Sequence, residues 1–388
     1  MSSMSRVGRP TVVFLFVSLI IGTLWPGVAK AAQVSKQVDS MGREYYLFTP
    51  DKIDPDVTYW LVVEVHGYGG QGSAGSGVRA WADRNDCIGI APSFPNDGYQ
   101  MLQKDADRQL VDIFQKLHKD FKLHDKLFLY GHSGGAQFSH RFALKYPRLV
   151  IGCCATSAGT WATGEYGGAY GKLTQAAAGI PIAISCGEKD IVPSGPNVPM
   201  TRIEWAKDFE KQLGKGQCFY KAEYWPNAGH EGDARGNAEL ASEAFSLGSS
   251  GMAGKDRTDF DARMKALNDS VQTGEFAHAM TGGGDLLKQM KLRNDKQTAD
   301  NLAAIHWSAG PSAISGCTQA AQQFAADQME KLSIDIENGA LNEVAAIEKN
   351  PAPDAMTKLQ SLYATFAGWT RVRAAVSQAA FRLRAKAG

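Results

Sequence analysis

Seven short apolar runs, rich in β-branched residues and separated by longer amphipathic stretches, limit how this chain can fold more than any other feature. The runs lie at residues 45–48, 59–65, 88–91, 126–130, 150–155, 181–185 and 219–224. In the stretch 105–121, apolar residues recur at helical spacing behind an acidic first turn. Strands that alternate with helices are typical of a parallel sheet covered on both faces. The pattern therefore predicts an α/β domain with a doubly wound, mostly parallel sheet over residues 32–247.

Residues 248–388 have a different character, because strand-like runs are missing from them. Stretches rich in Ala, Gln, Lys, Leu and Met lie at residues 286–307, 319–349 and 355–386. Residues 248–254 predict a linker and residues 350–354 a turn. Cys317 and His278 have no partners at metal-ligand spacing. We expect an all-helical C-terminal region that serves as a packing or interaction surface.

The N-terminus has the pattern of a targeting segment. Arg6 and Arg9 precede an uncharged run at residues 11–25, which is followed by the small-residue sequence AKA ending at Ala31. A basic start, a short apolar stretch and such a site are typical of a secretory signal peptide, here residues 1–31. The alternative is an uncleaved anchor helix, for which this run is short against ~30 Å of hydrocarbon.

Cleavage after Ala31 would place the mature protein in the periplasm or outside the cell. No later run of 18 apolar residues predicts a membrane span. Export would permit disulfides among the six cysteines, whose spacing fits no zinc site. Cys153 and Cys154 lie in an apolar run, so we expect them to be buried strand residues.

The charge balance bears on possible partners. The chain has 41 Lys and Arg residues against 40 Asp and Glu residues. Such a balance provides no excess positive field to attract a phosphate backbone. We therefore expect no nucleic-acid partner.

The sequence Gly-His-Ser-Gly-Gly at residues 131–135 follows one predicted strand and precedes an amphipathic stretch. A tight strand-to-helix turn lifts a serine out of the surface, and glycines two before and two after it avoid collisions in that turn. Ser133 would then stand at a helix N-terminus, where amides favour developing negative charge. This context predicts that Ser133 is a nucleophile.

A second glycine-rich segment, His-Gly-Tyr-Gly-Gly at residues 66–70, ends the predicted strand 59–65. Acyl transfer builds negative charge on a carbonyl oxygen, which two backbone amides can stabilise. We expect these amides to belong to Gly134, directly after the nucleophile, and to Tyr68.

An acid and a base follow the serine in chain order. Asp190 comes at the exit of the predicted strand 181–185, and His230 follows the strand 219–224. The order Ser, Asp, His with the acid and the histidine on loops after successive strands predicts a catalytic triad. Glu188 is the alternative acid.

Other residues near these motifs are candidates for contacting a substrate. His132 flanks the nucleophile, and we expect it to line the site. The segment 157–171 is rich in glycine and aromatic residues and lies where active-site loops collect. Trp161, with Tyr166 and Tyr170, is predicted to form an apolar wall. The alternative is that these rings only pack the loop onto the domain.

These four motifs, HGYGG, GHSGG, GEKDIVP and AGH, resemble those of the α/β-hydrolase superfamily. Within it, they are similar to the extracellular esterase branch that contains poly(3-hydroxybutyrate) depolymerases and feruloyl or acetyl xylan esterases. The resemblance covers residues 42–247. It implies hydrolysis of an ester, or less often an amide, without a metal or an organic cofactor. The expected substrate is a small-molecule or polysaccharide-linked ester; the alternatives are a serine peptidase and a non-catalytic binding protein of the same fold.

Overall fold

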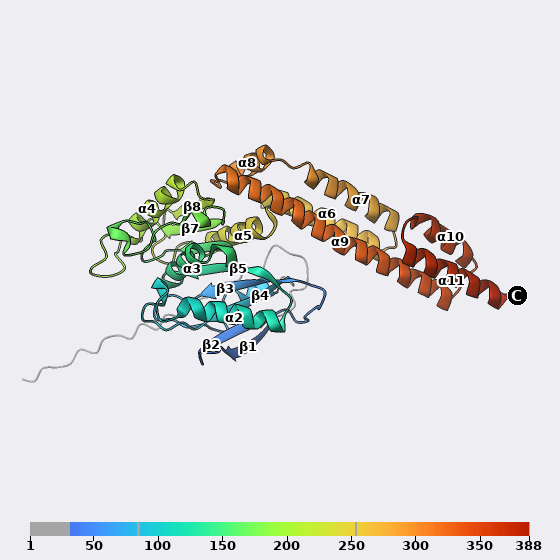
Figure 1. Cartoon of the computed structure of the whole chain (residues 1–388), viewed down its shortest axis with the longest axis horizontal. Coiled ribbons are helices and arrows are strands. Elements are labelled where there is room, and N and C mark those ends of the chain that lie inside the picture. The colour runs from blue at the N-terminus through green and yellow to red at the C-terminus, as the bar shows by residue number, and fades with distance from the viewer. Residues whose placement is uncertain (1–31, 84–85, 253, 388) are drawn as a thin grey trace, which may run out of the picture.

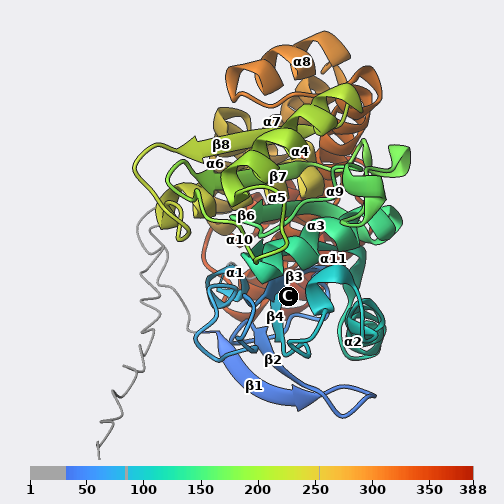
Figure 2. The ribbon, with the colours of Figure 1, turned by 90° about the vertical axis from the view of Figure 1, so that its left-hand side faces the viewer.

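The computed structural model describes residues 32–83, 86–252 and 254–387, and its centre is an eight-stranded sheet. The signal peptide predicted at residues 1–31 lies outside the described residues. The strands are β1 (Gln33–Val38), β2 (Glu44–Thr49), β3 (Tyr59–Val65), β4 (Cys87–Pro92), β5 (Leu123–His132), β6 (Val150–Thr156), β7 (Ile182–Gly187) and β8 (Tyr220–Trp225). Their spatial order is β1-β2-β4-β3-β5-β6-β7-β8, from the bottom to the top of Figure 2.

The strands pair as the sequence predicts for a mostly parallel sheet. β1 with β2 and β2 with β4 are antiparallel, and each later pair, from β3–β4 to β7–β8, is parallel. All seven predicted strands are present within two or three residues of the expected bounds. Strand β1 was not predicted, because the edge strand QVSKQV is largely exposed and has no buried face to impose an apolar alternation.

Helices cover both faces of the sheet. On one face, α2 (Ala106–Asp120), α3 (Gly134–Lys145) and α4 (Arg202–Lys215) contribute buried side chains to a core with β3 and β5. On the other face, α1 (Arg79–Ala82) and α5 (Ala234–Ser250) pack in a second core. The predicted doubly wound α/β architecture is therefore confirmed.

Helix α5 continues through the boundary predicted after residue 247. It starts where the Asp233 side chain accepts a hydrogen bond from Gly236 N at 2.6 Å, and it ends at Gly251, which is left-handed at φ 65°. The first three residues of the expected linker, 248–250, are therefore helical. A Cβ atom on Gly248 would lie 2.2 Å from the carbonyl oxygen of Ile151, so the missing side chain lets α5 lie directly on β6.

The C-terminal region is all helical, as predicted, and extends away from the sheet (Figure 1). Its helices are α6 (Gly254–Gln272), α7 (Phe276–Lys291), α8 (Asp295–Ala304), α9 (Pro311–Lys349), α10 (Ala355–Thr365) and α11 (Thr370–Ala387). The stretch predicted at 286–307 is divided between α7 and α8, because the Asn294 side chain accepts a hydrogen bond from Gln297 N at 3.0 Å and starts a new helix. None of the helices in the described part of the chain is long and apolar enough to cross a membrane.

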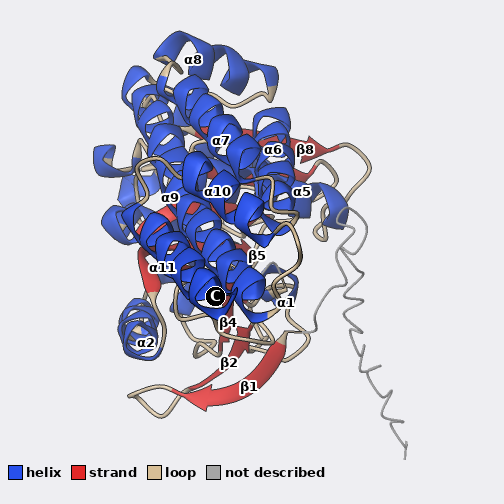
Figure 3. Ribbon diagram, turned by 90° about the vertical axis from the view of Figure 1, so that its right-hand side faces the viewer, coloured by secondary structure: helices blue, strands red, loops and turns tan. Residues whose placement is uncertain are grey.

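The long helix α9 joins this region to the α/β domain. At 39 residues it spans roughly 60 Å at 1.5 Å per residue. Near its start, a Cβ on Gly251 would lie 2.1 Å from the carbonyl oxygen of Cys317, so α5 and α9 are in close contact. Farther along, α6, α7, α10 and α11 surround α9 in a core of their own, and these helices face the viewer in Figure 3.

The close approach of α5 to β6 makes Gly248 a test of this arrangement. We expect Gly248→Ala to lower the free energy of unfolding by about 1–3 kcal/mol, because the added methyl group forces α5 away from the sheet. The matched control is Gly316→Ala in α9, where an added Cβ meets no atom within 4 Å and should stabilise the helix by up to about 1 kcal/mol. Denaturant unfolding of both variants gives the comparison, and equal effects would contradict the packing described.

Candidate active site

Ser133 stands on a strained turn between β5 and α3. Its backbone has φ 56° and ψ −116°, a conformation that costs a non-glycine residue about 1–3 kcal/mol. The flanking residues Gly131 and Gly135 must be glycines, because a side chain at either position would collide with the backbone. A Cβ on Gly131 would lie 2.4 Å from the carbonyl carbon and oxygen of Gly135, and one on Gly135 would lie 2.0 Å from the carbonyl oxygen of Val65. The turn therefore requires the glycines that the sequence motif contains, and it presents the serine at the edge of the sheet.

The structure brings together the three residues predicted to form a triad. His230 Nε2 lies 3.0 Å from Ser133 Oγ, and His230 Nδ1 lies 2.7 Å from Asp190 Oδ2. The Asp190 side chain is only 2% exposed, whereas that of the alternative acid Glu188 is exposed and outside this hydrogen-bonded chain. With its proton on Nδ1 directed at the carboxylate, the imidazole presents Nε2 as an acceptor to the serine hydroxyl.

The loops that carry the acid and the histidine are joined by backbone contacts. Glu188 N donates to Trp225 O at 3.0 Å, and Lys189 N donates to Ala228 O at 2.9 Å. A Cβ on Gly187 would lie 2.1 Å from the carbonyl oxygen of Gly229, so the two loops touch without a side chain between them. The pairing of β7 with β8 thus continues into the loops and holds the acid close to the histidine.

Arg202, which was not predicted from the sequence, binds the Asp190 oxygen that does not face His230. Its Nη1 lies 3.2 Å from Asp190 Oδ1. Arg202 is the first residue of α4, where Thr201 and Glu204 form a capping box. The sequence Thr-Arg-Ile-Glu contains the signal for this helix start. It contains no signal for the long-range contact with Asp190.

The two backbone amides predicted to stabilise an oxyanion lie beside each other. A Cβ on Gly134 would lie 2.7 Å from Tyr68 N, so the backbone of the nucleophile turn faces the 66–70 loop. Within the described residues, neither the Tyr68 amide nor the Gly134 amide donates to a protein acceptor. Two unpaired amides next to a candidate nucleophile can bind a developing oxyanion.

His66 and Tyr99 hold the loop that carries Tyr68. His66 Nε2 accepts a hydrogen bond from Phe94 N at 3.0 Å, and its Nδ1 donates to Gly67 O at 2.8 Å. Burial lowers the pKa of His66, which keeps the ring neutral as this pattern requires. The Tyr99 hydroxyl donates to His66 O at 2.6 Å. The loop is therefore held from both sides before any ligand binds.

His132 lies beside the base, as the sequence predicted for a residue lining the site. Its ring centroid is 5.0 Å from that of His230, and its Nδ1 lies 3.2 Å from Thr156 Oγ1. Burial, and then the neighbouring His230, lower the pKa of His132 to about 4. At neutral pH the ring of His132 is thus uncharged and lies next to that of His230.

The prediction that Trp161 forms a wall for substrate is wrong. Its side chain is 0% exposed and stacks on Phe209 of α4 with ring centroids 5.0 Å apart. Tyr166 and Tyr170 pack over Trp205, also of α4, at 5.5 and 5.0 Å. The aromatic residues of this loop fasten it to α4, which is the alternative that the sequence left open.

Three other apolar side chains are exposed next to the site. Tyr68, on the candidate oxyanion loop, is 69% exposed, and Ile191 and Val192, directly after the acid, are 65% and 59% exposed. Ser194 continues this loop toward α3, since a Cβ on Gly159 would lie 2.8 Å from both Ser194 Cβ and Gln137 Nε2. The exposed apolar side chains beside the triad therefore belong to two loops, the oxyanion loop at residues 66–70 and the acid loop at residues 188–201.

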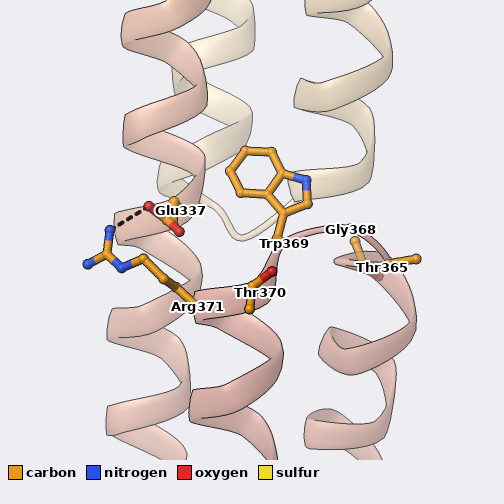
Figure 4. A pocket seen from close by; sticks show the side chains of 7 residues that line it. Glu337, Thr365, Gly368, Trp369, Thr370 and Arg371 are labelled. Carbon is orange, nitrogen blue, oxygen red and sulfur yellow. Dashed lines mark hydrogen bonds and ion pairs between the residues drawn. The ribbon is translucent and has the colours of Figure 1, made fainter.

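A surface hollow in the C-terminal region lies far from these residues. It is formed between α9 and the turn from α10 to α11, where Arg371 Nη1 donates to Glu337 Oε2 at 2.7 Å beside Trp369 (Figure 4). Its lining residues include neither a serine nor a histidine. The hollow therefore does not extend the candidate active site.

The cysteines take no part in the candidate site's hydrogen-bonded chain from Asp190 to Ser133. Cys153, Cys154, Cys186, Cys218 and Cys317 are buried free thiols, and the first two lie in β6 as expected. No cluster of three or more His, Cys, Asp or Glu side chains within the described residues is arranged to hold a metal ion.

No protein-family model matches this chain, and no curated protein matches it. Similar solved structures include a thermostable esterase at 21% identity and a TM-score of 0.41, over 51% of this chain and 55% of that one. An S-formylglutathione hydrolase from Staphylococcus aureus has 15% identity and a TM-score of 0.42, over 56% and 96% of the two chains. A ferulic acid esterase from Anaeromyces mucronatus, solved with ferulic acid, has 17% identity and a TM-score of 0.42, over 54% and 86%. The chain thus matches about half the length of the first and most of the other two.

The strain at Ser133 can be measured through stability. We expect Ser133→Gly to raise the free energy of unfolding by about 1–2 kcal/mol, because glycine adopts a positive φ without steric cost. The control is Ser377→Gly on the exposed side of α11, which should lower stability by about 0.5 kcal/mol. Chemical denaturation measures both changes, and a destabilised Ser133→Gly variant would show that the turn is not strained.

Proposed function

We propose that this chain is an exported serine hydrolase that cleaves carboxylic esters through an acyl-enzyme on Ser133. The observation that carries the proposal is the continuous hydrogen-bonded chain from Asp190 through His230 to Ser133, which ends at a strained turn beside two unpaired amides. A binding protein would need neither the buried acid nor the histidine. Export rests on the N-terminal pattern of residues 1–31.

The geometry supports a two-step reaction. His230 Nε2 takes the proton of the Ser133 hydroxyl as Oγ attacks the ester carbonyl carbon, and the amides of Tyr68 and Gly134 donate to the resulting oxyanion. Asp190 stabilises the imidazolium, which then gives its proton to the departing alcohol. Water, deprotonated by the same nitrogen, releases the acid and regenerates the serine hydroxyl.

The exposed apolar side chains support an ester with an apolar acyl or aryl group. Tyr68 lies on the loop that precedes the candidate oxyanion site, and Ile191 and Val192 directly follow the acid, so we propose that these three exposed side chains contact the acyl or aryl group. We propose a small-molecule or polysaccharide-linked ester as the substrate. Because the same triad can cleave amides, peptides belong in the substrate panel as the alternative.

Covalent labelling tests the proposed activity directly. We expect the mature protein to hydrolyse p-nitrophenyl acetate and to incorporate a fluorophosphonate probe at Ser133, identified by peptide mass spectrometry. Ser133→Ala should abolish labelling and reduce kcat roughly 10⁴-fold or more. The control is Ser194→Ala, an exposed serine on the acid loop, which should retain both. Wild-type protein that neither labels nor turns over would favour the non-catalytic binding protein.

Acyl-chain preference tests the role of the acid loop. We expect the double variant Ile191→Ser, Val192→Ser to lower kcat/KM roughly tenfold for a hexanoyl ester, because each lost methylene contact is worth up to about 0.8 kcal/mol. Hydrolysis of the acetyl ester should be nearly unchanged. Leu292→Ser, on an exposed residue of the C-terminal region, is the control. An unchanged ratio of hexanoyl to acetyl hydrolysis would remove these two residues from the acyl site.

A further inference from the structure

The two oxygens of the Asp190 carboxylate have different partners: one is hydrogen-bonded to His230 and the other to Arg202. Oδ2 lies 2.7 Å from His230 Nδ1, and Oδ1 lies 3.2 Å from Arg202 Nη1. Within the described residues, no other group donates a hydrogen bond to Oδ1. Because the carboxylate is 2% exposed, water cannot readily replace this donor. Arg202 therefore satisfies the half of the carboxylate that His230 does not.

The arginine is itself fixed from several directions. It opens α4, whose start is set by the Thr201 and Glu204 capping box. Its Nη1 also donates to Val192 O at 3.1 Å, and the next amide, Ile203 N, donates to Asp190 O at 3.3 Å. The first turn of α4 is thus docked on the main chain of the acid loop, and the guanidinium has little freedom to leave the carboxylate.

We propose that Arg202 is a positioning residue for the reaction, which holds Asp190 in the rotamer that faces His230 and sets the pH below which the enzyme loses activity. This inference rests on the proposed hydrolase function. Arg202 is expected to have two separable effects on that function: it orients the Asp190 carboxylate, and its charge affects the protonation of His230.

The orientation effect arises because a variant without Arg202 would leave Asp190 Oδ1 without a hydrogen-bond donor. A buried carboxylate oxygen without a donor favours rotation toward water, which would take Oδ2 away from His230. A base that is misplaced by about 1 Å can cost up to ~10² in rate. Removal of Arg202 should therefore lower kcat and leave the KM of a short ester nearly unchanged.

The charge effect comes from the positive charge of Arg202 and not from the hydrogen bond that it donates. The titratable groups that face Asp190 are His230 from the loop after β8, Cys186 from β7, His132 from the end of β5 and Arg202 from α4. Arg202 is the permanent cation among them, and it offsets part of the attraction of the carboxylate for protonated His230. Without that cation, the imidazole would hold its proton to a higher pH. The acid limb of kcat/KM should then move upward by roughly one pH unit, because the repulsion between two nearby positive charges is removed.

Three substitutions separate the two effects. Arg202→Met removes the donor and the charge, so we expect a roughly tenfold or larger loss of kcat together with the upward shift of the acid limb. Arg202→Gln keeps a donor without charge, so kcat should be largely restored while the acid limb stays shifted. Arg202→Lys keeps the charge, so the acid limb should stay at the wild-type pH. The control is Lys189→Met, which removes an exposed cation next to Asp190 in sequence without any contact to its carboxylate.

The measurements are pH profiles of kcat and kcat/KM for a p-nitrophenyl ester, with thermal unfolding of each variant. Equal acid limbs in the Gln and Lys variants would overturn the charge effect, and wild-type kcat in a folded Met variant would overturn the orientation effect. If the Met variant does not fold, a Gln variant with wild-type kcat and an unshifted acid limb overturns the proposal. A shift of the same size in Lys189→Met would also overturn it. Failure of the hydrolase function itself would appear separately, as wild-type protein without turnover or probe labelling.

Discussion

The structure depends on the close approach of α3 to the ends of β3 and β5. Gly131 and Gly135 leave no space for a β-carbon, since Gly135 lies against the carbonyl oxygen of Val65. This contact forces the backbone of Ser133 to a positive φ, and the packing of α3 and the sheet compensates for the strain. It also brings the amide of Gly134 next to the loop of Tyr68. One steric constraint thus positions the nucleophile and both candidate oxyanion donors.

The remaining groups reach this point because parallel strands end at the same edge of the sheet. Ser133 N donates to Thr156 O at 2.9 Å, and Ser157 N donates to Ser185 O at 2.7 Å, so the ends of β5, β6 and β7 are joined in sequence. The loops after β7 and β8 continue the strand pairing and carry the acid and the histidine. Ser133 and His230, which are 97 positions apart in the chain, therefore come within hydrogen-bonding distance of each other.

The outer C-terminal helices α6, α7, α10 and α11 have a core separate from the two cores of the sheet, whereas Leu302, Trp307, Ala313 and Cys317 belong to one of the sheet's cores. The region is attached through the contact of α5 with the start of α9 and through the segment before α9, where Trp307 packs on Phe219 and Ser308 pairs with Tyr220 of β8. Across the outer part of α9, Arg371 bonds Glu337 and Arg382 bonds Glu348, so two of the basic residues of α11 hold it to α9. In Figure 1 the outer helices of this region extend away from the sheet. Their expected role in packing or interaction stays a prediction.

The sequence by itself determined seven of the eight strands, the helical C-terminal region, the glycines of the Ser133 turn, and the residues Asp190 and His230 as partners of Ser133. The strands, helices and turn are local features, because turn chemistry and apolar periodicity depend on neighbouring residues, whereas the triad was inferred from the chain order of its residues on loops after successive strands. It could not determine the edge strand β1, which has no buried face, or the continuation of α5 past residue 247, where Gly248 packs directly on β6. Only the tertiary structure decided that Trp161 is buried on Phe209, that His66 holds the oxyanion loop, and that Arg202 binds Asp190. Each of these depends on which distant element packs against the residue, and burial and charge pairing of that kind leave no periodic signal in the chain.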